Sequence, residues 1–101
     1  MWSMDAAWLA HRDDVAHLDR KPSEVFREHF CFTTQPIEEP DDPQQLVQAL
    51  EFTGMTDRIM FASDYPHWDF DDPAFMLKRL PESWRGPVLS DNAAALYGAR
   101  L

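Results

Sequence analysis

Apolar residues along this chain gather into two short β-prone runs, which are separated by a segment with helical periodicity. The first run is Phe30–Thr34. The second, Ile59–Ser63, shows no alternation of apolar and polar residues, which is typical of a parallel strand covered on both faces. Between them, Asp42-Pro43 predicts the start of a helix and Gly54 its end. This order of strand, helix and strand predicts two neighbouring parallel strands joined by a crossover helix.

Further helical segments flank the two predicted strands. Apolar residues that recur every three or four positions predict a helix from Met1 to about Asp19, and Ser23–His29 adds one or two turns. Asp72-Pro73 repeats the start signal of the crossover helix and predicts another helix, with Asp72 as its cap. A last short helix is predicted from about Asn92 to Tyr97.

A sheet of two parallel strands is not a finished structure. Its outer edges would expose unpaired backbone groups, and both of its faces need cover. We therefore predict an α/β fold class in which the chain is part of something larger. The chain has 101 residues, four Trp and seven Phe. Since so small a domain has little interior, we expect some of these aromatic side chains to contact missing structure or a partner.

Charge and cysteine content narrow the range of partners. The formal net charge of −9 argues against binding to nucleic acid or to an anionic membrane surface. The single Cys31 excludes an internal disulfide and a multi-cysteine zinc site, and its apolar neighbours predict a buried, inert thiol. The sequence shows no signal peptide and no transmembrane span, so we expect a cytoplasmic protein.

The candidate chemistry lies directly after the second predicted strand. Asp64 follows Ser63 at the carboxyl end of that strand, which is where active sites gather in α/β folds. A carboxylate there can bind a divalent cation or accept a proton, and His67 lies within reach of the same edge. The alternative is structural, because an Asp after a strand often caps its own loop and a loop His often only hydrogen-bonds.

Three stretches carry a family resemblance: FTTQPIEEP at 32–40, DRIMFASDYPHWDFDDP at 57–73 and NAAALYG at 92–98. Together they closely resemble the last part of the amidohydrolase-related metal-dependent hydrolases. The branch they resemble includes aminocarboxymuconate-semialdehyde decarboxylase and resorcylate decarboxylase. The SDYPHWD segment is the most specific of the signals, and the resemblance covers nearly the whole chain.

The resemblance implies a partial (β/α)₈ TIM barrel, in which residues 1–29 are a helical lead-in and residues 30–101 form the last two βα units, strands 7 and 8, with a closing helix. It implies that Asp64 contacts a divalent metal, zinc or manganese, and acts as the general base. His67 and Trp68 would line the substrate pocket. The substrate would be a small carbonyl or carboxylate compound, which the enzyme hydrolyses or decarboxylates.

The histidine metal ligands of this family come from its first strand, as an HxH pair, and from its fifth and sixth strand regions, and no such segment is present here. A complete barrel needs roughly 250 residues, and a catalytic zinc needs about three protein ligands. We therefore expect the chain alone to bind no metal and to be inactive. It would need the missing N-terminal barrel segment or a homo-oligomer.

Two other hypotheses stay open. The chain could be a non-catalytic remnant that acts as an oligomerising or interaction module. It could also be a free-standing cation-binding protein that uses Asp64, His67, Asp69 and Asp71. Against the second, the spacing lacks the glycine and distal glutamate of an EF-hand loop.

Overall fold

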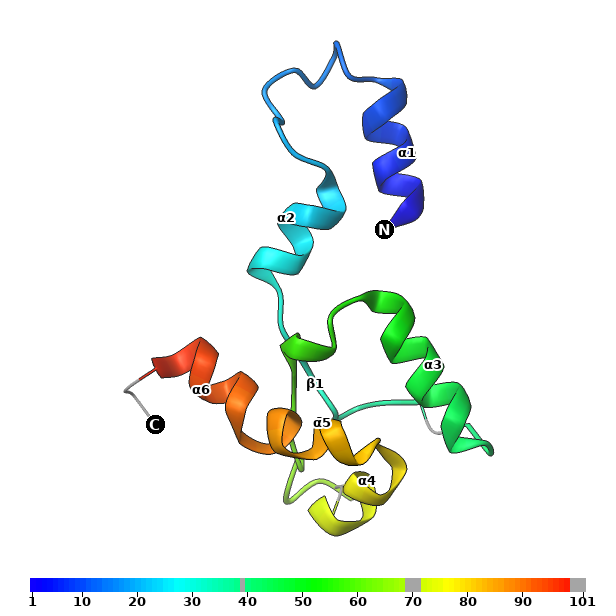
Figure 1. Cartoon of the computed structure of the whole chain (residues 1–101), viewed down its shortest axis with the longest axis vertical. Helices are drawn as coiled ribbons and strands as arrows, with labels where there is room; N and C mark the ends of the chain where they lie inside the picture. Colours follow the sequence, from blue (N-terminus) through cyan, green and yellow to red (C-terminus); the bar gives the residue numbers. More distant parts are fainter. Residues whose placement is uncertain (39, 69–71, 99–101) are drawn as a thin grey trace. The chain divides into compact units, whose positions relative to one another are not determined.

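The structure is a computed structural model that describes residues 1–38, 40–68 and 72–98 (Figure 1). These residues form a mixed fold of helix and sheet with mostly helices, in two compact units, Met1–Phe30 and Cys31–Leu101. The elements of the second unit are, in chain order, β1 (Phe32–Thr33), α3 (Pro43–Thr53), the 3₁₀ turn η1 (Thr56–Arg58), β2 (Ile59–Met60), α4 (Pro73–Arg79), α5 (Glu82–Gly86), the π-helical turn η2 (Pro87–Asp91) and α6 (Asn92–Tyr97).

The first unit consists of helix α1 (Trp2–Ala10), a turn region and helix α2 (Pro22–His29). One side chain of α1 binds the N-terminus of α2: the Asp5 carboxylate accepts hydrogen bonds from the backbone N–H of Ser23 at 2.9 Å and from its hydroxyl at 2.6 Å. The free N–H groups of a helix N-terminus favour such an anionic acceptor. Asp5 therefore caps α2 from a neighbouring helix.

The predicted helix from Met1 to about Asp19 is too long, since α1 ends at Ala10 and the chain continues through turns. After Ala10, hydrogen bonds from side chains to the backbone take over from the α-helical hydrogen bonds. The Trp8 indole N–H donates to the carbonyl oxygen of Leu18 at 3.2 Å, and the Arg12 guanidinium donates to the same oxygen. Polar side chains that bond to nearby backbone groups compete with helix formation in this way.

The sheet of the second unit is the predicted parallel pair. Phe32 pairs with Ile59, and Thr33 pairs with Met60. Both strands are shorter than the predicted ranges, because beyond Met60 the hydroxyl of Thr34 replaces the backbone of β1 as the partner of Ala62. Beyond Met60, the backbone N–H of Phe61 donates to the carbonyl oxygen of a helix residue, Val88, at 2.8 Å.

A continuous helical run of three elements, α5, η2 and α6, follows Pro81, and only its last part was predicted. The run changes from α-helix to π-helix at Pro87, which has no N–H to donate to the preceding turn. Within η2 the N–H of Asn92 bonds to the carbonyl oxygen of Pro87, five residues back. The oxygen of Val88, its partner in a regular α-helix, is then available to accept the N–H of Phe61.

The prediction of open sheet edges is wrong for β2. The amide nitrogen of the Asn92 side chain donates to the carbonyl oxygens of Ile59 at 2.8 Å and of Thr56 at 3.3 Å. With the bond from Phe61 to Val88, these contacts satisfy backbone groups on the side of β2 that faces away from β1. The C-terminal helical run thus covers the edge that we expected to be exposed.

The core of the second unit lies where this helical run meets β2. Ile59, Leu80 and Val88 form a buried cluster, and Leu50, Phe61 and Trp84 pack against it. The predicted crossover helix is confirmed as α3, and the helix predicted after Asp72 is confirmed as α4. Their caps are also confirmed, since Asp42 accepts from the N–H of Gln44 at 2.9 Å and Asp72 from that of Ala74 at 2.7 Å.

Many large apolar side chains remain exposed within the units, as their number had predicted. Helix α1 has no buried residue, and Met4 and Leu9 are 54% and 60% exposed. Cys31 is a free cysteine and is half-buried, so its predicted burial is wrong, while the inertness of its thiol stays a prediction. Within the described ranges, no helix combines the length and apolar character needed to cross a membrane.

Candidate functional site

Asp64 lies just beyond the carboxyl end of β2, in the segment that continues from the buried strand into a turn. Because β1 and β2 run parallel, the carboxyl end of β1, where Thr34 lies, is at the same edge of the sheet. The Asp64 side chain is 55% exposed, so solvent or another molecule can reach its carboxylate. A carboxylate in this place can accept a proton or bind a cation.

The backbone at Asp64 has a left-handed conformation, with a φ of 57°. Asp and Asn adopt this conformation more readily than other residues with a side chain. The Asp64 carbonyl oxygen accepts the N–H of His67 at 2.8 Å, which closes a tight turn, and the Ser63 hydroxyl accepts the N–H of Tyr65 at 3.3 Å. One backbone hydrogen bond and one bond to a hydroxyl therefore define the direction in which the chain leaves β2.

This turn brings His67 beside Asp64, as the spacing of three residues had suggested. The His67 Nδ1 atom lies 3.9 Å from Asp64 Oδ2, a distance that suits an ion pair when the imidazole is protonated and is too long for a hydrogen bond. The His67 side chain is 56% exposed. Trp68 follows at 87% exposure, with its ring centroid 6.2 Å from that of His67. The structure thus places an acid, an imidazole and an indole on one exposed turn.

The described residues do not form a metal centre by themselves. Asp64 and His67 offer two possible ligands, and no group of three His, Cys, Asp or Glu side chains that could hold a metal ion occurs in the part of the chain that the structure describes. A catalytic zinc needs about three protein ligands. Asp69 and Asp71, which the cation-binding hypothesis requires, lie outside the described residues, while Asp72 caps α4.

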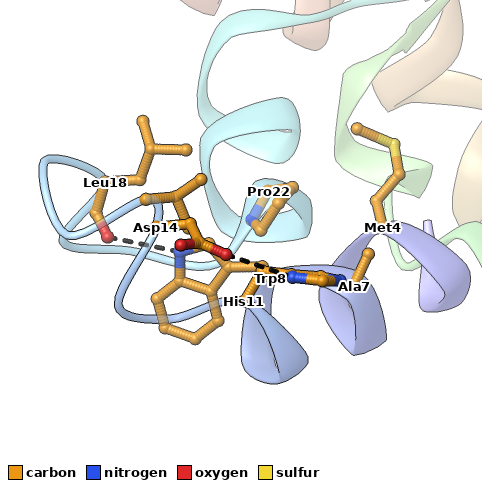
Figure 2. Close-up of a pocket in the computed structure, with 8 residues that line it drawn as sticks. Met4, Ala7, Trp8, His11, Asp14, Leu18 and Pro22 are labelled. Carbon is orange, nitrogen blue, oxygen red and sulfur yellow. Dashed lines mark hydrogen bonds and ion pairs between the residues drawn. The ribbon is translucent and has the colours of Figure 1, made fainter.

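The first unit contains a pocket that does not include Asp64, His67 or Trp68. Figure 2 shows it between α1 and the returning chain, lined mainly by apolar side chains with the His11–Asp14 pair, whose Nδ1 and Oδ2 atoms are 3.3 Å apart. Both members of this pair are exposed. The lining residues are Met4, Ala7, Trp8, His11, Asp14, Val15, Leu18 and Pro22.

Comparison with known protein families covers both units. Residues 1–99 match the family described as Amidohydrolase. The chain belongs to the amidohydrolase family. No curated protein matches it. Membership indicates a hydrolase-type enzyme, and the amidohydrolase family typically uses divalent metals.

Two parts of this region were not foreseen from the sequence. The first is Thr34, a buried residue whose hydroxyl contacts the segment before Asp64. A Thr inside a β-prone run carries no signal of that role. The second is the contact of Asn92 with β2. Asn92 begins the NAAALYG stretch, but only the fold shows to which carbonyl oxygens its side-chain amide donates.

Proposed function

We propose that this amidohydrolase chain supplies Asp64 to the active site of a metal-dependent hydrolase or decarboxylase. In this site the Asp64 carboxylate contacts the metal and acts as the general base that accepts a proton during the reaction. His67 and Trp68 form part of the wall of the substrate pocket, and the substrate is a small carbonyl or carboxylate compound. The observation that carries the proposal is the exposed carboxylate at the carboxyl edge of a parallel sheet, in a chain of this family.

The arrangement of the sheet supports a place in a barrel. Active sites of (β/α)₈ barrels lie at the carboxyl ends of the strands, where side chains from several strands meet. We propose β1 and β2 as the seventh and eighth strands of such a barrel, in which the first strand replaces Asn92 and Val88 at the outer edge of β2. The histidines that complete the metal site then come from other polypeptide, because the described residues supply at most two ligands. The chain alone is therefore proposed to be inactive.

The test is a reconstitution with the polypeptide encoded immediately upstream of codon 1. The DNA there is sequenced and translated in all frames, and the product is made together with this chain. We expect a frame that encodes an HxH pair and further histidines, and a co-purified complex that retains zinc or manganese and turns over small carboxylates or amides. The chain alone is the control. Absence of any such frame, or a complex that retains no metal, contradicts the proposal.

One observation favours a second candidate, a non-catalytic oligomerising module. Helix α1 exposes apolar residues such as Met4 and Leu9 and buries none. A helix that is apolar without a buried face normally packs against something. This candidate predicts a defined oligomer by analytical ultracentrifugation, cooperative melting, and no response of the melting temperature to zinc or manganese. A monomer that melts without cooperativity contradicts it.

A further inference from the structure

The hydroxyl of Thr34 extends the sheet beyond the end of β1. Thr34 is 1% exposed, and its backbone N–H donates to the carbonyl oxygen of Met60 at 2.9 Å. Its Oγ1 accepts the N–H of Ala62 at 3.1 Å and donates to the carbonyl oxygen of the same residue at 3.3 Å. A hydroxyl can donate and accept at once, so this one side chain satisfies both backbone groups of Ala62.

These bonds lie two residues before Asp64. Ala62 is held by Thr34 from the side of β1, while the preceding Phe61 is held by the Val88 carbonyl oxygen from the other side. The two contacts fix the chain between the end of β2 and the left-handed turn at Asp64. The Val88 contact is made by backbone, whereas the Thr34 contact depends on a side chain that substitution can remove.

We propose that Thr34 is a positioning residue, whose hydroxyl sets the place of the Asp64 carboxylate by anchoring Ala62. This inference rests on the proposed function, in which Asp64 does the chemistry. The competing explanation is that Thr34 only fills space in the interior, in which case its methyl group and volume matter and its hydroxyl does not. Valine matches the shape of threonine without the hydroxyl, and serine keeps the hydroxyl without the methyl group.

The test compares Thr34→Val with Thr34→Ser by amide hydrogen exchange and NMR of the chain. The half-buried N–H of Ala62 loses its acceptor in the valine variant, and an unpaired donor favours local opening of the segment. We therefore expect Thr34→Val to speed exchange of the Ala62 amide by roughly tenfold or more. We also expect it to shift the backbone signals of Asp64 and His67, whose turn the segment carries. Thr34→Ser retains the wild-type exchange rate and signals.

The matched control is Thr33→Val, the same change at the adjacent position. Thr33 is exposed, and its hydroxyl donates to the carbonyl oxygen of Gln35 at 3.0 Å. This variant should leave the Ala62 amide and the Asp64 signals unchanged. The inference is overturned if Thr34→Val leaves them unchanged as well, or if Thr34→Ser loses them. If Thr34→Val does not fold, the serine variant alone still decides between hydroxyl and volume.

Failure of this inference is distinguishable from failure of the proposed function. The exchange and NMR measurements report the position of the segment and do not depend on any catalytic role. Unchanged turnover in an Asp64→Asn variant of the assembled protein would contradict the proposed function, and the anchoring of Ala62 would stand. Unchanged signals in Thr34→Val would contradict the anchoring alone.

Discussion

Replacement of Asn92 by alanine tests how the C-terminal helical run supports the site. The Asn92 amide donates to the carbonyl oxygens of Ile59 and Thr56, at 2.8 and 3.3 Å. Each such bond contributes about 1 kcal/mol net to folding, and alanine recovers a few tenths of a kcal/mol as the better helix former. The free energy of unfolding should therefore fall by about 1.5 kcal/mol, which for a domain of this size lowers Tm by roughly 6–12 °C.

The assay is urea and thermal unfolding followed by circular dichroism at pH 7. The control is Ser90→Ala, an exposed position in the same helical run, which should change the free energy of unfolding by less than about 0.5 kcal/mol. The m-value should not change, because the substitution alters contacts and not the surface that unfolding exposes. If Asn92→Ala destabilises the chain no more than Ser90→Ala, the hydrogen bonds from the Asn92 side chain to Ile59 and Thr56 do not contribute to the free energy of unfolding.

Two further predictions concern the two units separately. Two hydrogen bonds lower the pKa of Asp5 below its ordinary value of 3.8, the larger effect coming from the Ser23 hydroxyl and the smaller from the Ser23 N–H. This cap therefore stabilises the first unit above that pH, and the stabilisation is lost as the pH falls through the lowered pKa. We expect the signals of Asp5 and Ser23 to shift together below about pH 4 in NMR titrations. Asp5→Asn should remove this transition, and the control Asp13→Asn should keep it. A transition that survives Asp5→Asn refutes the assignment. In the second unit, Met76 is 1% exposed, so Met76→Ala should cost about 2–5 kcal/mol in urea unfolding. Leu96→Ala, at a 47% exposed position, should cost less than about 1 kcal/mol, and equal losses would contradict the placement of the core.

Local signals predicted the elements whose ends are fixed by adjacent residues. Helices α3 and α4 each follow an Asp-Pro pair whose Asp accepts a backbone N–H, and Gly54 ends α3 with a φ of 62°. The parallel pairing of β1 and β2 followed from the length of the crossover between them. The helix caps depend on contacts within a few residues, which a sequence pattern records, and the pairing follows from a general rule of chain connection.

Contacts between distant residues could not be predicted in this way. Helix α1 ends early because Trp8 and Arg12 bond to the backbone of Leu18. Strand β2 ends early because the Thr34 hydroxyl, and not the backbone of β1, bonds to Ala62. The bond between Thr34 and Ala62 spans 28 positions of the chain. For the site, the sequence predicted that Asp64 follows a strand and that His67 lies near it. The exposure of the two side chains and the 3.9 Å between His67 Nδ1 and Asp64 Oδ2 could be learned only from the fold.

The most direct test of the central claim is the turnover of the assembled, metal-loaded protein with Asp64→Asn. Asparagine keeps the size of the side chain and tolerates the left-handed backbone at this position, so it removes the base and leaves the turn intact. Asp57→Asn is the control, since Asp57 is also exposed but lies at the amino end of β2. Loss of a general base typically lowers kcat by about 10²–10⁴-fold, and we expect a loss in this range for Asp64→Asn and none for Asp57→Asn. Equal turnover in the two variants would contradict the assignment of Asp64.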